Sequence, residues 1–500
     1  MRVALLLLLI IGVAGCIPST QSNTASTQES NQSSTIVDDN VTIIDNEANC
    51  TAYDANITQG RALFTQNCVV CHANDGYSGD QDIRGRTAYQ IEWAFNGVAQ
   101  MSGYDFDTLF SDADVIAIES YLAQLQSNPA IVTQTVCSDA TSKALLGSTL
   151  FVDKNLSLTR TLACSSCHNP SRAFVDGRYH TMNGTHPVNG ALSLGDDGVS
   201  LGGRNAPTVL YAQFSPTFAQ GNDGNYTGGQ FHDGRAATLM HQAKGPFLDT
   251  AEMMMPSAGA VIERVKANPS YVSQLKTLYG ATVLDSNTTA YDAVADAIAT
   301  FERNAIFAPF DSKYDRFKEG NYTMSTLEAQ GYALFFSNAL SCKKCHTINS
   351  ASEKASHELF TNYAYENIGT PRNLVALQAR DGNTSHIDLG LGGRSDINDS
   401  RHYGKVKVPT LRNIAITAPY MHNGVFQSLE AVLAFYDHRS AQGSHATNPE
   451  TNASWESADV NATINRTLLE ASAPLSDSDI AALVAFLKLL TDARYESLLD

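Results

Sequence analysis

The chain has 500 residues, a formal net charge of −18 at pH 7 and a hydrophobic fraction of 43%. This length predicts two to four domains, each with an ample core. The negative charge argues against nucleic acid and against anionic membrane surfaces as partners.

The first sixteen residues predict export. A short basic start precedes an apolar run that is too short to span a bilayer, and small residues lead to Cys16. Residues 1–16 are similar to a bacterial lipoprotein signal, so we expect Cys16 to carry a lipid as the only membrane attachment; an ordinary secretory signal is the alternative. The protein would then lie in the bacterial cell envelope, facing the periplasm or in the outer membrane. Residues 17–49 are rich in Ser, Thr, Asn and Gln and predict a flexible tether.

Six of the nine cysteines form three copies of the sequence Cys-x-x-Cys-His. In this motif two thiols add to the vinyl groups of one haem, and the histidine ligates its iron. A zinc knuckle would need four clustered ligands, and a redox dithiol would not recur three times with a histidine after it. The sequence therefore predicts three covalently bound haems c, at Cys68, Cys71 and His72, at Cys164, Cys167 and His168, and at Cys342, Cys345 and His346.

The first haem motif predicts a mono-haem cytochrome c domain over residues 50–138. Cys50 and Cys137 bracket it and suggest a disulfide in an oxidising compartment. Met101 lies 29 residues after His72, where a thioether ligand would suit electron transfer and close the haem to oxygen chemistry.

Repeated phrases predict two further units of the same kind, over residues 139–320 and 321–500. Gly147 and Gly331 each open a short helical phrase that ends in Leu-Phe, before the haem motif. At the far end, Ser476 begins an acidic first turn that continues as an amphipathic helix. The fold class is therefore predicted to be mainly α, with three tandem cytochrome c-like helical domains and long loops.

Residues 140–500 also carry several separated motifs in a fixed order, at 203–208, 231–236, 242–246 with 252–253, 408–413 and 419–424. With these motifs the chain resembles the di-haem cytochrome c peroxidase/MauG family. The resemblance implies that peroxide binds at an open face of the His168 haem, while the His346 haem relays electrons. It also implies roles for Gln242 and Glu252, which stand ten residues apart. Glu252 would move the proton that peroxide cleavage requires, and Gln242 would orient the ligand or a water.

The resemblance further implies one calcium ion between the two haems. Its ligands would be the Asn205 side chain and the backbone carbonyls of Thr417 and Pro419, all neutral oxygen donors that calcium accepts.

The chain departs from the family pattern at three places. The distal histidine that blocks the open haem in many of these peroxidases is Gly184 here, which suggests a permanently open haem, as in MauG. Tyr436, fourteen residues after His422, favours a tyrosine ligand for the relay haem, with Met421 as the rival. The family's inter-haem tryptophan is His232, which puts fast exchange of oxidising equivalents between the haems in doubt.

Two functions follow from the resemblance. The first is a peroxidase that reduces hydrogen peroxide to water, with electrons entering through the N-terminal domain from a small cytochrome or a quinol. The alternative is a MauG-like oxidase, which would use peroxide-derived Fe(IV) haems to oxidise side chains of a partner protein. A pure electron-transfer chain is the third reading, and Gln242 with Glu252 argues against it.

Overall fold

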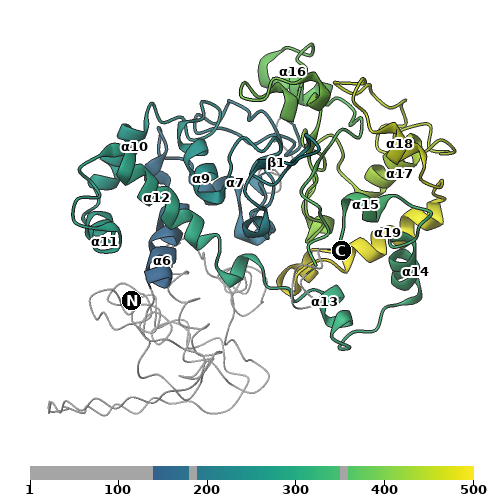
Figure 1. The fold of residues 1–500 in the computed structure, drawn as a ribbon, viewed down its shortest axis with the longest axis horizontal. Helices are drawn as coiled ribbons and strands as arrows, with labels where there is room; N and C mark the ends of the chain where they lie inside the picture. Colours follow the sequence, from purple (N-terminus) through teal and green to yellow (C-terminus); the bar gives the residue numbers. More distant parts are fainter. Residues whose placement is uncertain (1–138, 179–187, 349–357, 500) are drawn as a thin grey trace, which may run out of the picture. The chain divides into compact units, whose positions relative to one another are not determined.

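The computed structural model describes residues 139–178, 188–348 and 358–499 of the chain. This part is mainly helical, with only two short two-stranded sheets, which confirms the predicted helical class (Figure 1). The segments predicted as signal, tether and first cytochrome domain lie outside it, and so do Cys16, Cys50, Cys68, Cys71, His72, Met101 and Cys137. In the described ranges no helix is both long and apolar enough to cross a membrane.

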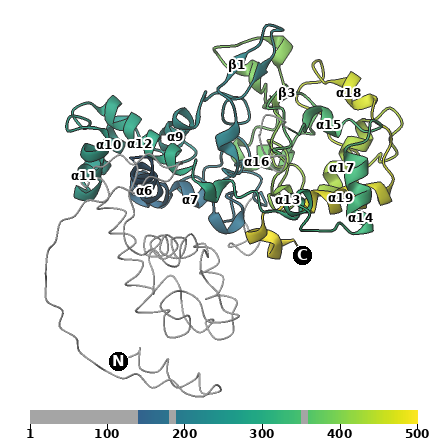
Figure 2. The same cartoon turned by 60° about the horizontal axis from the view of Figure 1, so that its bottom comes forward.

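The first described unit is built around one crossing of two helices. Helix α6 (Asp139–Val152) packs on α12 (Asn287–Phe301), and the two lie side by side in Figures 1 and 2. A Cβ atom at Gly147 would stand 2.0 Å from the carbonyl oxygen of Ala297, so only glycine permits this approach. The same unit contains α7 (Cys164–Cys167), α9 (Leu239–Leu248), α10 (Ala258–Lys266) and α11 (Pro269–Tyr279).

The second described unit repeats this crossing. Helix α14 (Thr326–Phe335) packs on α19 (Asp477–Lys488), and Gly331 meets the Ala482 carbonyl as Gly147 meets that of Ala297. Helix α19 begins after Ser476 with a capping box, as its sequence predicts. The other helices here are α13 (Lys313–Lys318), α15 (Cys342–Cys345), α16 (Leu374–Asp381), α17 (Leu429–Arg439) and α18 (Arg466–Glu470).

The two sheets are antiparallel pairs of two-residue strands. Strand β1 (Ala219–Gln220) pairs with β2 (Tyr226–Thr227), and β3 (Tyr365–Glu366) pairs with β4 (Val406–Lys407). Ala219 stands opposite Thr227, and Tyr365 stands opposite Lys407.

Two equivalent backbone hydrogen bonds join the two units. The backbone N–H of Asn205 donates to the carbonyl of His422, and the N–H of Lys407 donates to the carbonyl of His232, both at 2.8 Å. Because each unit donates to the other in the same way, corresponding residues can be compared directly.

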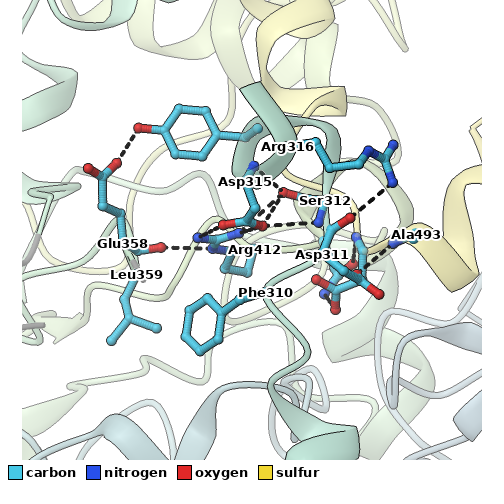
Figure 3. A network of polar contacts seen from close by, with 12 residues as sticks. Phe310, Asp311, Ser312, Asp315, Arg316, Glu358, Leu359, Arg412 and Ala493 are labelled. Atoms are coloured by element: carbon cyan, nitrogen blue, oxygen red, sulfur yellow. Dashed lines mark hydrogen bonds and ion pairs between the residues drawn. The ribbon is translucent and has the colours of Figure 1, made fainter. Parts of the chain in front are cut away.

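A buried ion pair holds helix α13 to the rest of the second unit (Figure 3). The guanidinium of Arg412 donates to both carboxylate oxygens of Asp315, at 2.5 and 2.9 Å, and to the carbonyl of Glu358 at 2.7 Å. Ser312 Oγ donates to the same carboxylate at 2.6 Å. The Arg412 side chain is 0% exposed, so the pair is fully removed from water.

Candidate active site

Two histidines that follow the cysteine pairs are held in the same way. The Nδ1–H of His168 donates to the Phe174 carbonyl at 3.1 Å, and that of His346 donates to the Phe360 carbonyl at 2.9 Å. Burial lowers the pKa of both imidazoles, which favours the neutral form. In each ring the Nε2 lone pair therefore points away from the backbone contact and can ligate iron.

The cysteine pairs form one-turn helices, α7 and α15, each ended by its histidine. Residues three apart lie on one side of a helical turn, so both thiols of a pair face the same way. All four thiols are unbridged: Cys164, Cys167, Cys342 and Cys345. Across the ranges that the structure describes, no group of three or more His, Cys, Asp or Glu is placed to hold a metal ion, so zinc gains no support. These residues fit a covalently attached haem in each unit.

A cavity of about 460 Å³ opens beside His168. It brings together the histidine with Gln242 and Glu252, the two residues predicted to act on peroxide. Its lining also includes Cys167, Pro246 and Glu302.

Helix α9 positions the catalytic candidates. Thr238 caps the helix, Gln242 lies one turn later, and Glu252 follows the end of the helix. The Glu252 backbone is fixed on both sides, because its N–H donates to the Asp249 carbonyl at 3.2 Å and its carbonyl accepts from the Asp196 N–H at 2.8 Å.

The Glu252 carboxyl titrates near neutral pH. Burial is the main reason that its pKa rises to about 7; the charge of Asp249 adds to the rise and Arg235 opposes it. A carboxyl with this pKa can both accept and release a proton under physiological conditions.

The two units differ at one position of the corresponding helices α9 and α17. Pro246 is the eighth residue after the cap Thr238, and Tyr436 is the eighth after the cap Ser428 of α17. Proline has no side-chain donor atom and could ligate no metal, whereas a tyrosine phenol could.

In the second unit the Tyr436 phenol is buried, and its pKa is raised by that burial and by the nearby Cys345 and Cys342. Tyr436 therefore lies near the attachment cysteines, and its role as a haem ligand stays a prediction. Met421, the rival, packs against the core of the same unit with a positive φ of 71°.

A polar array lies where the two units meet. The ring of His232 stands 6.4 Å from that of His422, and its Nε2–H donates to the Asn205 carbonyl at 3.0 Å. Burial, with repulsion from His422 and Arg204, lowers the pKa of His232 to about 3, so this histidine is neutral. His232 takes the place of the family's inter-haem tryptophan, so a neutral imidazole stands at that position.

The predicted calcium ligands include Asn205, whose Nδ2 donates to the Ala191 carbonyl at 3.2 Å. In the repeat, Lys407 corresponds to Asn205, and its ammonium donates to the Gly229 carbonyl at 2.5 Å. Lys407 therefore places an ammonium against a carbonyl of the first unit, where the corresponding Asn205 has an amide. Calcium at Asn205, Thr417 and Pro419 stays a prediction, and its neutral donor set suits that ion.

Three residues at this site were not singled out from the sequence: Pro246, Glu302 and Lys407. Aligning the two repeats by their helix caps would have found Pro246, because its partner Tyr436 was predicted. The segment with Gly184, whose place in the family belongs to the blocking histidine, lies outside the described residues.

Comparison with known proteins agrees with this geometry. A family model described as "Di-haem cytochrome c peroxidase" matches residues 141–323, and one described as "Cytochrome C oxidase, cbb3-type, subunit III" matches residues 55–122. The chain is 43% identical to the methylamine utilization protein MauG of Paracoccus denitrificans, over 71% of this chain and 90% of that protein.

Two further relatives are peroxidases. The cytochrome c peroxidase Ccp of Escherichia coli is 31% identical over 60% of this chain and 54% of its own length. The solved diheme peroxidase BthA of Burkholderia thailandensis is 30% identical, with a TM-score of 0.61 over 72% of this chain and 88% of that one.

Proposed function

Because the chain belongs to the di-haem cytochrome c peroxidase/MauG family, we propose that it reduces hydrogen peroxide to water in the His168 cavity. The protein is a haem-dependent oxidoreductase that acts on peroxide. One observation carries the assignment of the cavity: Gln242 and Glu252 line it beside His168, together with Pro246, whose side chain could ligate no metal.

The reaction consumes one peroxide, two electrons and two protons and yields two waters. A haem bound here would supply the iron and its redox chemistry. His168 would hold that group through Nε2, with its ring fixed by the hydrogen bond to the Phe174 carbonyl. The Glu252 carboxylate takes a proton from one peroxide oxygen and returns it to the other as the O–O bond breaks, while the Gln242 amide orients the substrate.

The proposed relay haem, ligated by His346 and Tyr436, can be tested apart from the peroxide site. Tyr436→Phe removes the phenol oxygen with little change in volume, so we expect that haem to become five-coordinate and high-spin. Peroxide should still bind at the His168 haem. Electron paramagnetic resonance of the oxidised protein measures both effects. An unchanged low-spin signal in Tyr436→Phe would transfer the ligand role to Met421, and Tyr403→Phe, a tyrosine elsewhere in the unit, serves as the control.

We also propose that electrons enter through a third haem, in the domain that contains Met101. The family model matched over residues 55–122 supports a cytochrome there. A donor domain fused to the enzyme raises its own effective concentration at the peroxidase unit.

Met101→His should lower the potential of this haem by on the order of 100 mV, since imidazole favours ferric iron. Steady-state peroxide consumption with a reduced small cytochrome or a quinol should slow accordingly. Haem content and direct binding of peroxide should stay as in the wild type. An unchanged potential would contradict the role of Met101, and unchanged donor oxidation at a lowered potential would contradict this route of entry.

A further inference from the structure

Glu302 is a second buried carboxyl in the His168 cavity. It follows the last residue of α12, lines the cavity, and is only 5% exposed. Its Oε2 atom has no hydrogen-bond partner in the part of the chain that the structure describes. A buried polar atom without a partner is costly, so its presence in a cavity calls for a functional account.

The repeat shows that the fold itself does not need a carboxyl here. The crossing glycine Gly147 also approaches the Cβ of Phe301, and Gly331 approaches the Cβ of Phe486, so these phenylalanines correspond. The next residue is Glu302 in the first unit and Leu487 in the second, where the leucine is 6% exposed and packs in the core. The same core position therefore carries a carboxyl only in the unit with the open haem position.

Burial raises the pKa of Glu302 to about 8, and Arg303, the adjacent residue, opposes this only in part. The carboxylate form therefore predominates only above about pH 8. The charges of Glu302 and Glu252 both raise the pKa of the Cys164 thiol, but a thiol that attaches a haem no longer titrates. His168 is kept neutral by burial. Arg303 is the charged group that acts on Glu302, and the cavity that Glu302 lines also contains Glu252, Asp249 and Arg235.

An electron that arrives in this cavity adds negative charge to a region of low dielectric constant. A carboxylate without a cationic partner opposes that electron, and binding a proton removes the opposition. Reduction of peroxide also consumes two protons from outside the substrate, and Glu252 supplies neither of them when it moves a proton of peroxide from one oxygen to the other.

We propose that Glu302 binds a proton when the haem of the His168 cavity gains an electron, and later passes this proton to product water. At a pH above about 8, where Glu302 starts as the carboxylate, it becomes a carboxylic acid as the iron is reduced by one electron, with the proton drawn from solvent. It returns to carboxylate when the proton leaves with the water. The second half of this cycle rests on the proposed peroxidase function, whereas the first half concerns reduction alone.

The test measures the midpoint potential of each haem against pH, by optical titration of the full haem-loaded chain without peroxide. In the wild type the potential of the His168 haem should fall with rising pH through the range where Glu302 titrates. The slope should approach a tenfold change in equilibrium constant per pH unit, about 59 mV for one electron. Glu302→Leu, which installs the residue of the other unit, and the isosteric Glu302→Gln should both lose this slope. The His346 haem serves as the internal control.

A second signal separates proton binding from a purely structural role. On reduction at a pH above about 8, the infrared difference spectrum of the wild type should gain the carbonyl band of a protonated carboxylic acid, and Glu302→Gln should lack it. If Glu302→Leu fails to load haem, Glu302→Gln still decides the question.

Either of two outcomes would overturn the inference. A pH slope that persists in the Glu302 variants would exclude this carboxyl, and a slope lost only in Glu252→Gln would give the role to Glu252. Because the titration uses no peroxide, its result stands whether or not the protein turns peroxide over.

Discussion

Replacing Glu252 with glutamine is expected to reduce peroxide turnover by about 10²-fold or more, the range for loss of a general acid–base group. The amide fills the same space but cannot take the proton from peroxide. Haem content and thermal stability should match those of the wild type. The measurement is steady-state peroxide consumption at saturating electron donor.

The direction in which the turnover rate changes with pH tests the same assignment. Glu252 must begin as the carboxylate, and burial raises its pKa to about 7. The wild-type rate should therefore rise with pH up to about 7 and level off above it, while the Glu252→Gln rate should lack this step. Glu263→Gln is the matched control, because that side chain is 70% exposed and forms an ion pair with Lys266 on the same helix. Wild-type turnover in Glu252→Gln would refute the assignment of the acid–base group.

Replacing Arg412 with leucine is expected to destabilise the protein by about 3–5 kcal/mol, because it leaves the Asp315 carboxylate buried and unpaired. The loss should appear as a lower midpoint in urea-induced unfolding of the haem-loaded chain. Leucine is the natural choice, since Leu210 holds the equivalent place in the first unit. Leu210 and Arg412 each stand two residues after a threonine, Thr208 or Thr410. The hydroxyl of that threonine donates to the carbonyl of the residue that precedes the backbone partner of the haem-motif histidine.

A matched exposed pair controls for the loss of an arginine as such. Arg401 pairs with Asp399 at 2.6 Å, and its side chain is 73% exposed. Arg401→Leu should cost no more than about 1 kcal/mol, as expected for surface ion pairs. Equal losses in the two variants would show that the buried pair contributes nothing beyond an ordinary surface contact.

Features encoded by neighbouring residues were predicted from the sequence. Each haem attachment motif spans five residues, and in the two copies that the structure describes the cysteine pair forms a one-turn helix that ends at its histidine. The helix that begins after Ser476 was predicted for the same reason, because a cap and its first turn are local. The helical class and the family were confirmed.

Features that depend on packing over long sequence distances were not predicted. The burial of Glu302 follows from the crossing of α6 and α12, which brings Gly147 against Ala297. Arg412 and Asp315 are 97 residues apart, and neither sequence context predicts a buried pair. The choice between Tyr436 and Met421 depends on which atom meets the iron, and both side chains lie in the second unit.

The most direct test of the central claim is the number of donor electrons oxidised per peroxide consumed by the haem-loaded protein. A reduced small cytochrome or a quinol serves as the donor, and the protein's own side chains are analysed afterwards by mass spectrometry. A peroxidase predicts two electrons per peroxide over many turnovers, with the side chains intact. Peroxide consumed without donor oxidation, together with oxidised side chains on the chain or on an added protein, would contradict the claim and favour the oxidase alternative.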